Sequence, residues 1–109
     1  MHYSIEKDEW RDEPELTDPR YNHSSCCLGA YVYVFGGQRA YDDHLSTVEC
    51  LMFGFGEPWQ VIAENSLARR EAPALAVLNT HQIACFGGQG SKYKALDDGF
   101  VLDMRDNSI

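Results

Sequence analysis

The sequence predicts a small all-β protein built from a repeated antiparallel unit, and three observations lead to this prediction. The pentapeptide VFGGQ, which begins at Val34, returns as CFGGQ at Cys85, 51 residues later. Two short apolar runs separated by a tight turn precede each copy, as in a β-hairpin. No stretch shows a sustained apolar period of 3.6 residues, which an amphipathic helix would require.

Length and charge limit the function further. The 109 residues suffice for one small domain. With 17 acidic against 9 basic residues the net charge is -8, which argues against nucleic-acid and anionic-membrane partners. No apolar run reaches the roughly 18 residues of a membrane span, no signal-peptide pattern is visible, and the four cysteines fit neither a CxxC metal site nor a disulfide framework. We expect a reduced, cytoplasmic protein.

The elements follow in chain order. A first strand surrounds Trp10, and the connections at 29–30 and 79–81 are short enough for tight hairpins. The segment 54–58, rich in Gly and Pro, turns the chain into the last strand of the first unit. Four short strands per unit of about 50 residues is the size of one β-propeller blade. The expected strands are 25–28, 31–34, 47–52 and 59–62 in the first unit, and 75–78, 82–85 and 100–104 in the second.

These residues resemble the kelch repeat of β-propeller proteins. Matching features are an arginine before the first strand, two glycines after the second, and a tryptophan about 22 residues after the glycines. The second copy has Ala84-Cys85 where the first has Tyr33-Val34, and it lacks the closing tryptophan. The residues that carry the resemblance are Arg20, Gly36, Gly37 and Trp59 for the first copy, and Arg69 or Arg70, Gly87 and Gly88 for the second. Trp10, ten residues before Arg20, belongs to the strand that precedes the first copy.

The resemblance implies a partial kelch-type propeller with two four-stranded blades' worth of strands. Residues 1–19 would be an acidic segment containing strand d of a preceding blade, residues 20–65 the first repeat, and residues 66–109 the second repeat without its last strand. Two blades cannot close a ring, because propellers have four to eight. The chain is therefore expected to be either a fragment of a longer kelch protein or a protomer that assembles with copies of itself to complete a propeller.

Up-and-down connectivity predicts which loops share a face. The loops before the first strand of each unit (17–20 and 66–70) and those after each Gly-Gly (38–44 and 89–94) fall together. Binding residues favour loops on a rigid scaffold, so this face is the expected surface for a protein partner. The candidate partner-binding residues are Arg20, Gln38, Arg39, Tyr41, Arg69, Arg70, Gln89, Lys92 and Tyr93.

Each candidate also has a structural interpretation. The arginines could clamp a partner's carboxylate or satisfy the carbonyls of an adjacent loop, and both interpretations stay open. Tyr41 and Tyr93 suit interface anchors, although a tyrosine without a partner fits as well. The glycine pairs are expected to allow close backbone approach, because no helix follows them as in a phosphate-binding loop. Trp10 and Trp59 are expected to pack between blades.

Nothing in the sequence predicts catalysis, a metal or a cofactor. No Ser-His-Asp or paired-carboxylate arrangement is visible, and Asp42-Asp43-His44 fits a solvated turn better than a metal site. The kelch resemblance implies a non-catalytic protein–protein interaction module. The alternative is a fragment of a larger kelch-containing protein, either a substrate adaptor or a copper-radical oxidase-like enzyme, with no function of its own.

Overall fold

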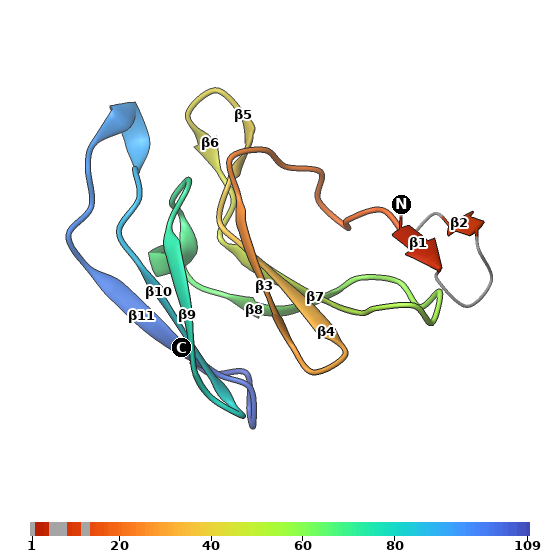
Figure 1. Cartoon of the computed structure of the whole chain (residues 1–109). Helices are drawn as coiled ribbons and strands as arrows, with labels where there is room; N and C mark the ends of the chain where they lie inside the picture. Colours follow the sequence, from red (N-terminus) through yellow and green to blue (C-terminus); the bar gives the residue numbers. More distant parts are fainter. Residues whose placement is uncertain (1, 5–8, 12–13) are drawn as a thin grey trace.

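The computed structural model describes residues 2–4, 9–11 and 14–109, the first two ranges by their backbone alone. Apart from two single-turn 3₁₀ segments, Ser66–Ala68 and Ser91–Tyr93, all regular structure in these residues is β (Figure 1). The strands are β1 (His2–Ser4), β2 (Glu9–Arg11), β3 (Ser24–Leu28), β4 (Tyr31–Phe35), β5 (Gln38–Ala40), β6 (Asp43–His44), β7 (Thr47–Met52), β8 (Gln60–Glu64), β9 (Ala74–Asn79), β10 (Gln82–Phe86) and β11 (Gly99–Asp103).

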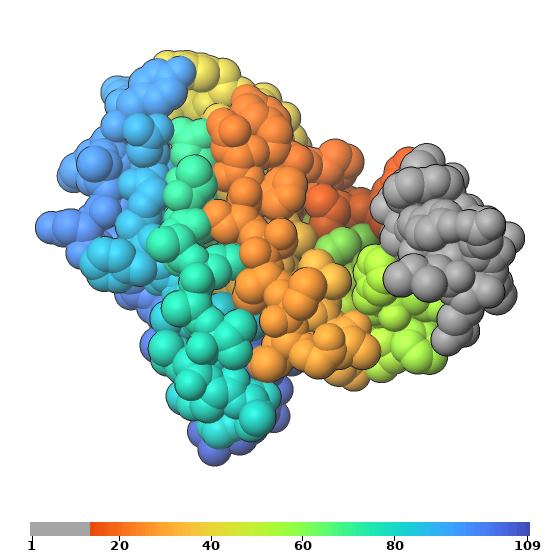
Figure 2. Space-filling view, viewed as in Figure 1, coloured from red at the N-terminus to blue at the C-terminus, as the bar shows by residue number. Residues whose placement is uncertain are grey.

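Two antiparallel sheets form the body of the molecule. The four-stranded sheet has the order β3-β4-β7-β8 and is called blade 1 here; the three-stranded sheet has the order β9-β10-β11 and is called blade 2. The first strands of the two blades, β3 and β9, lie side by side, and the sheets splay apart from there (Figure 1). Figure 2 shows the same two strands, orange and green-blue, in contact on the face turned to the viewer. The all-β prediction is confirmed, and the arrangement is that of a partial kelch-type propeller without ring closure among the described strands.

The core lies between the blades, because one face of each sheet is apolar. Side chains alternate between faces along a strand, so Tyr33 and Phe35 of β4 point the same way, toward blade 2. The rings of Phe35 and Phe100 meet with centroids 6.2 Å apart. Burying one such side chain contributes about 1.5–3 kcal/mol. The buried cluster consists of Tyr33, Phe35, Val48, Ala68, Ile83, Cys85, Phe100 and Leu102.

The N-terminal strands form a ladder of their own. β2 pairs with β1 and not with blade 2, and Trp10 stands opposite Tyr3 in this ladder. The described strands thus include no preceding blade with which β2 pairs, and the assignment of this segment to such a blade stays a prediction. The side chain of Trp10 lies outside the described residues.

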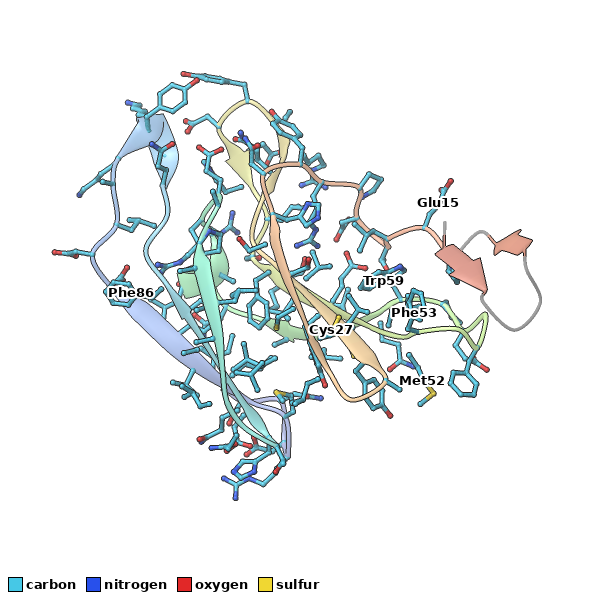
Figure 3. The ribbon with its side chains drawn as sticks, viewed as in Figure 1. Glu15, Cys27, Met52, Phe53, Trp59 and Phe86 are labelled. Carbon is cyan, nitrogen blue, oxygen red and sulfur yellow. The ribbon has the colours of Figure 1, made fainter. Side chains whose placement is uncertain are left out.

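Two local features differ from the expected elements. The loop after Gly37 contains the hairpin β5–β6, whose register the short polar sequence does not predict. The sequence predicts Trp59 inside the last strand of the first unit, but β8 begins one residue later. The Trp59 indole nitrogen instead donates to the carbonyl of Pro14 at 2.8 Å, so this side chain ties the N-terminal segment to blade 1 (Figure 3).

Candidate functional site

The side chain of Arg20 is fully buried and connects parts of blade 1. Its Nη1 donates to the carbonyls of Gly36 at 2.9 Å and Thr47 at 3.0 Å. Its Nη2 donates to Thr47 Oγ1 and to Glu49 Oε2, both at 2.8 Å. The Arg20–Glu49 ion pair has no solvent-exposed side-chain surface. Buried charges need partners of this kind, and here the guanidinium joins the entry segment to strands β4 and β7.

Arg70 takes the equivalent position in blade 2. Its Nη1 donates to the carbonyls of Gly87 and Asp98, both at 3.0 Å, and its Nε donates to Leu67 O at 2.8 Å. The guanidinium also lies 5.6 Å from the centroid of the Phe100 ring, a distance at which a cation and an aromatic face attract.

The burial of these two arginines decides between the two open interpretations of their role. Both side chains are satisfied inside the protein and have almost no surface to offer a partner. The sequence left Arg69 and Arg70 as alternatives, and the structure selects Arg70 as the equivalent of Arg20. Arg69 is exposed, and its Nη1 donates to His44 O at 3.3 Å.

The first glycine pair permits close backbone approach, as expected. Gly36 has φ +69, and a Cβ there would collide with the carbonyl of Arg70. The neighbouring Gly37 donates its N–H to that same carbonyl at 2.8 Å. A Cβ on Gly88 would collide with the carbonyl of Glu71. The glycines therefore allow the entry segments of the blades to lie directly against the strand ends.

The loops after the two glycine pairs meet each other at the surface, where Figure 2 shows them in yellow and light blue. Tyr41 and Tyr93 are 70% and 63% exposed, and their rings form an edge contact with centroids 5.9 Å apart. The Asp42 carboxylate accepts from the Lys92 N–H at 2.8 Å and from Ser91 Oγ at 3.0 Å. We call these five residues, Tyr41, Asp42, Ser91, Lys92 and Tyr93, the tyrosine cluster.

Charge and backbone geometry support this cluster. The hydrogen bonds from Lys92 and Ser91 favour the ionised carboxylate and lower the pKa of Asp42. The neighbouring Tyr41 is the main cause that raises the pKa of Tyr93. Asp42, Lys92 and Tyr93 all have left-handed φ values, between 55° and 59°. Residues other than glycine adopt this backbone conformation mainly in tight turns. The cluster is thus a cross-link between two tight turns from different blades.

A buried acidic side chain lies beneath the tyrosine cluster. Glu71 Oε2 accepts from Asn22 Nδ2 at 2.9 Å and from Gln38 Nε2 at 3.0 Å. Its other oxygen, Oε1, lies 3.8 Å from His44 Nε2. Gln38 is therefore part of the contact between the blades and not of the surface. Glu71 and Asn22 were not predicted from the sequence, because nothing in their local pattern indicates that the two segments meet.

The remaining candidates lie at or near the surface. Arg39 is exposed and pairs with Asp43, Nε to Oδ2, at 3.1 Å. Gln89 is exposed, and its backbone bridges to Glu71 and Ala95. Lys92 belongs to the tyrosine cluster. Of the nine predicted residues, the surface thus brings together Tyr41, Lys92 and Tyr93.

A hollow of about 620 Å³ opens at the other end of the molecule, between the two hairpin turns. Tyr31, Tyr33 and Ile62 from blade 1 and Met104 and Arg105 from blade 2 are among its lining residues. Burial raises the pKa of Tyr33 to about 12, with a further contribution from Cys50. This hollow was not predicted from the sequence, because its walls come from segments that belong to different repeats.

Neither a metal-ligand cluster nor a membrane-spanning helix occurs in the part of the chain that the structure describes. Within residues 14–109 no three His, Cys, Asp or Glu side chains gather as metal ligands, Asp42, Asp43 and His44 included. The described part of the chain contains no helix that is long and apolar enough to cross a membrane.

Comparison with known proteins identifies the first unit. Residues 19–51 match the family model described as the Kelch motif. A comparison with curated proteins gave no match. The matched range contains Arg20 and the two carbonyl acceptors of its Nη1, Gly36 and Thr47. The chain therefore carries a kelch motif, which spans residues 19–51 and forms the first three strands of blade 1.

Proposed function

We propose that the chain is a non-catalytic protein-interaction module, and that its contact surface is centred on the tyrosine cluster. The observation that carries this proposal is the pairing of Tyr41 with Tyr93. Two loops from different repeats bring exposed aromatic rings together, and Asp42 fixes one loop to the other. A rigid surface of this kind loses little conformational entropy on binding.

The chemistry of the cluster suits a protein partner. Tyrosine offers a large apolar ring and a hydroxyl, and it is enriched among residues that dominate the energy of protein interfaces. Lys92 within the cluster and Lys94 beside it are exposed cations. A partner segment that places a hydrophobic or aromatic side chain on the rings, with acidic or polar groups toward the lysines, would complement this surface. The net charge of -8 disfavours a nucleic acid as an alternative partner.

The proposed compartment is the cytoplasm. All four cysteines, at 26, 27, 50 and 85, are free thiols in the structure, and free thiols persist in reducing compartments. Cys27 is exposed, so an oxidising environment would leave it open to intermolecular disulfide formation.

A peptide-display selection tests the proposed surface and does not require the partner to be identified first. Peptides selected on the wild-type chain are compared, by titration, for binding to Tyr41→Ala/Tyr93→Ala and to Phe55→Ala. Phe55 is a matched control, because it is an equally exposed aromatic residue in the loop between β7 and β8. The proposal expects binding to the double variant to weaken at least tenfold, with binding to the control unchanged. Selected peptides that bind both variants as tightly as the wild type would overturn it.

A further inference from the structure

The outer face of blade 2 is an apolar sheet surface that nothing in the described chain covers. Residues that stand opposite one another on paired strands share a face, and the ladders place Ala76, Ala84 and Val101 together and Ala74 beside Phe86. Phe86 is 56% and Val101 40% exposed. Figure 3 shows Phe86 at the flank of this sheet that is turned away from blade 1. We call Ala74, Ala76, Ala84, Phe86 and Val101 the outer face.

The matching face of blade 1 shows what such a surface packs against. With the 51-residue offset, Tyr33 and Phe35 in β4 correspond to Ala84 and Phe86 in β10. Blade 2 covers these blade 1 residues, and Phe35 has no exposed surface. The contact is reinforced at the glycine pair, where Arg70 O accepts from Gly37 N.

The equivalent glycine pair of blade 2 has no such neighbour within the described residues. A Cβ on Gly87 would meet a single atom within 4 Å, the carbonyl oxygen of Leu96 at 3.7 Å. At Gly36, by contrast, a Cβ would collide with the incoming Arg70 carbonyl. Gly87 thus leaves open the space that an entry segment fills in blade 1.

The side chain that would arrive there can be identified from the repeat. In the contact between the blades, Glu71 enters blade 1 and accepts from Asn22 and Gln38, with His44 nearby. The residue equivalent to Glu71 is Tyr21, because Tyr21 bridges to Gln38 as Glu71 bridges to Gln89. Tyr21 is 46% exposed in the monomer.

The receiving positions of blade 2 suit an aromatic ring better than a carboxylate. Ala72 stands where blade 1 has Asn22, since both have a left-handed φ and follow the bridging residue. Ala95 stands where blade 1 has His44, because Ala95 bridges to Gln89 as His44 pairs with Gln38. Two of the three polar side chains around Glu71 are therefore replaced by alanine, which leaves room for the larger ring of Tyr21.

We propose that a second copy of this chain docks on the outer face, head to tail, and repeats the contact between blade 1 and blade 2. Blade 1 of the second copy would cover Phe86 and Val101, its Arg20 carbonyl would accept from Gly88 N–H, and its Tyr21 would lie against Ala72 and Ala95. A head-to-tail contact uses two different surfaces and generates a closed ring or an open array. This interface is separate from the tyrosine cluster.

Light scattering coupled to size exclusion tests the proposal, with one variant for each side of the interface. Phe86→Glu places a charge on the outer face, and Tyr21→Glu brings a carboxylate against Ala72 and Ala95. We expect the wild type to have at least twice the mass of one chain and each variant to have the mass of one chain. The matched control is Phe55→Glu, the same change at an exposed phenylalanine in the loop between β7 and β8, and it should assemble like the wild type.

Mixing the two variants identifies the head-to-tail geometry. Phe86→Glu retains an intact Tyr21, and Tyr21→Glu retains an intact outer face, so an equimolar mixture should give a dimer of twice the chain mass. A wild type with the mass of one chain at about 100 μM, or a Phe86→Glu variant that assembles like the wild type, would overturn the proposal. Val101→Glu, on the neighbouring strand of the same face, replaces Phe86→Glu if circular dichroism shows that variant to be unfolded.

Discussion

Arg20 and Arg70 make the same pair of backbone hydrogen bonds in the two blades. Arg20 Nη1 donates to the carbonyls of Gly36 and Thr47, and Arg70 Nη1 donates to those of Gly87 and Asp98, which follow them by 51 residues. In both blades the guanidinium thereby fixes the entry segment to the ends of the second and third strands. The kelch arginine of this chain is a part of the framework on which the loops are displayed.

Replacing Arg70 should destabilise the fold strongly. Arg70→Leu leaves the carbonyls of Leu67, Gly87 and Asp98 without this donor in a partly buried setting, where each missing hydrogen bond costs at least about 1 kcal/mol. We expect a loss of about 3 kcal/mol in the free energy of unfolding, measured by urea denaturation. Arg69→Leu is the control and should change it by less than about 0.5 kcal/mol, because that side chain is exposed. Equal losses would contradict the assignment of Arg70 as the equivalent of Arg20.

The two blades stabilise their arginines differently, which leads to a second prediction. Glu49 in β7 pairs with Arg20 and also accepts from the backbone N–H groups of Thr17 and Asp18. Phe100, at the equivalent position, presents its ring to Arg70. Glu49→Ala would leave a buried guanidinium without its counter-ion, and such losses typically cost about 3–5 kcal/mol.

An exposed ion pair provides the control for Glu49. Asp43→Ala breaks the ion pair between Asp43 and Arg39, whose side chains are 49% and 57% exposed, respectively. This change should lower the free energy of unfolding by less than about 1 kcal/mol. The urea midpoint of Glu49→Ala should therefore fall well below that of Asp43→Ala. Similar midpoints would show that the buried pair contributes no more than a surface one.

The strands could be predicted from the sequence because their signals are local. Apolar runs of four to six residues on either side of Gly29 and before each Gly-Gly predict hairpins whatever their neighbours are. The internal repeat then assigned the order of the strands within each unit. The packing of Trp59 between blades stays a prediction, and the contact of its indole with Pro14 could not be predicted from the local sequence.

The site was harder to predict, because it depends on contacts between the repeats. Arg20 and Arg70 stand in polar segments of an acidic chain, where a charged side chain is usually exposed, and only the tertiary structure shows their carbonyl acceptors. Glu71 similarly gives no local sign that it enters blade 1. Tyr41 and Tyr93 were placed on the same face by connectivity alone, but their contact and the bond from Lys92 to Asp42 depend on left-handed turns that the sequence did not indicate.

The four thiols should differ in reactivity. Burial raises the pKa of Cys85 to about 11, with the charge of Arg70 opposing part of the shift, so Cys85 is almost entirely the unreactive thiol at pH 8. Cys27 is exposed on the opposite face of β3 from Cys26. Iodoacetamide at pH 8, followed by peptide mass spectrometry, should modify Cys27 first and Cys85 only after unfolding.

Labelling in 8 M urea is the control for this comparison, because unfolding should make the four rates similar. Modification of Cys85 at the rate of Cys27 in the native protein would show that blade 2 opens on the time scale of the labelling.

The cross-link within the tyrosine cluster should depend on pH through Asp42. Its carboxylate accepts from Lys92 N and Ser91 Oγ, which lowers its pKa below the ordinary value of 3.8. A group with a lowered folded-state pKa stabilises above its unfolded pKa, and this contribution is lost as the pH falls through the folded value. The contact between the loops should thus be complete at pH 6 and weaken only below pH 3.8.

The amide resonance of Lys92 reports this change directly. In a titration by heteronuclear NMR from pH 6 downward, we expect its proton shift to move upfield as Asp42 is protonated, with a midpoint below 3.8, because the hydrogen bond to the carboxylate is lost. The same resonance in Asp42→Ala should start near that acidic position and show no such transition, which separates the effect of Asp42 from that of other carboxylates. A midpoint at or above 3.8 in the wild type, or a transition that survives in Asp42→Ala, would show that Asp42 does not hold the two loops together.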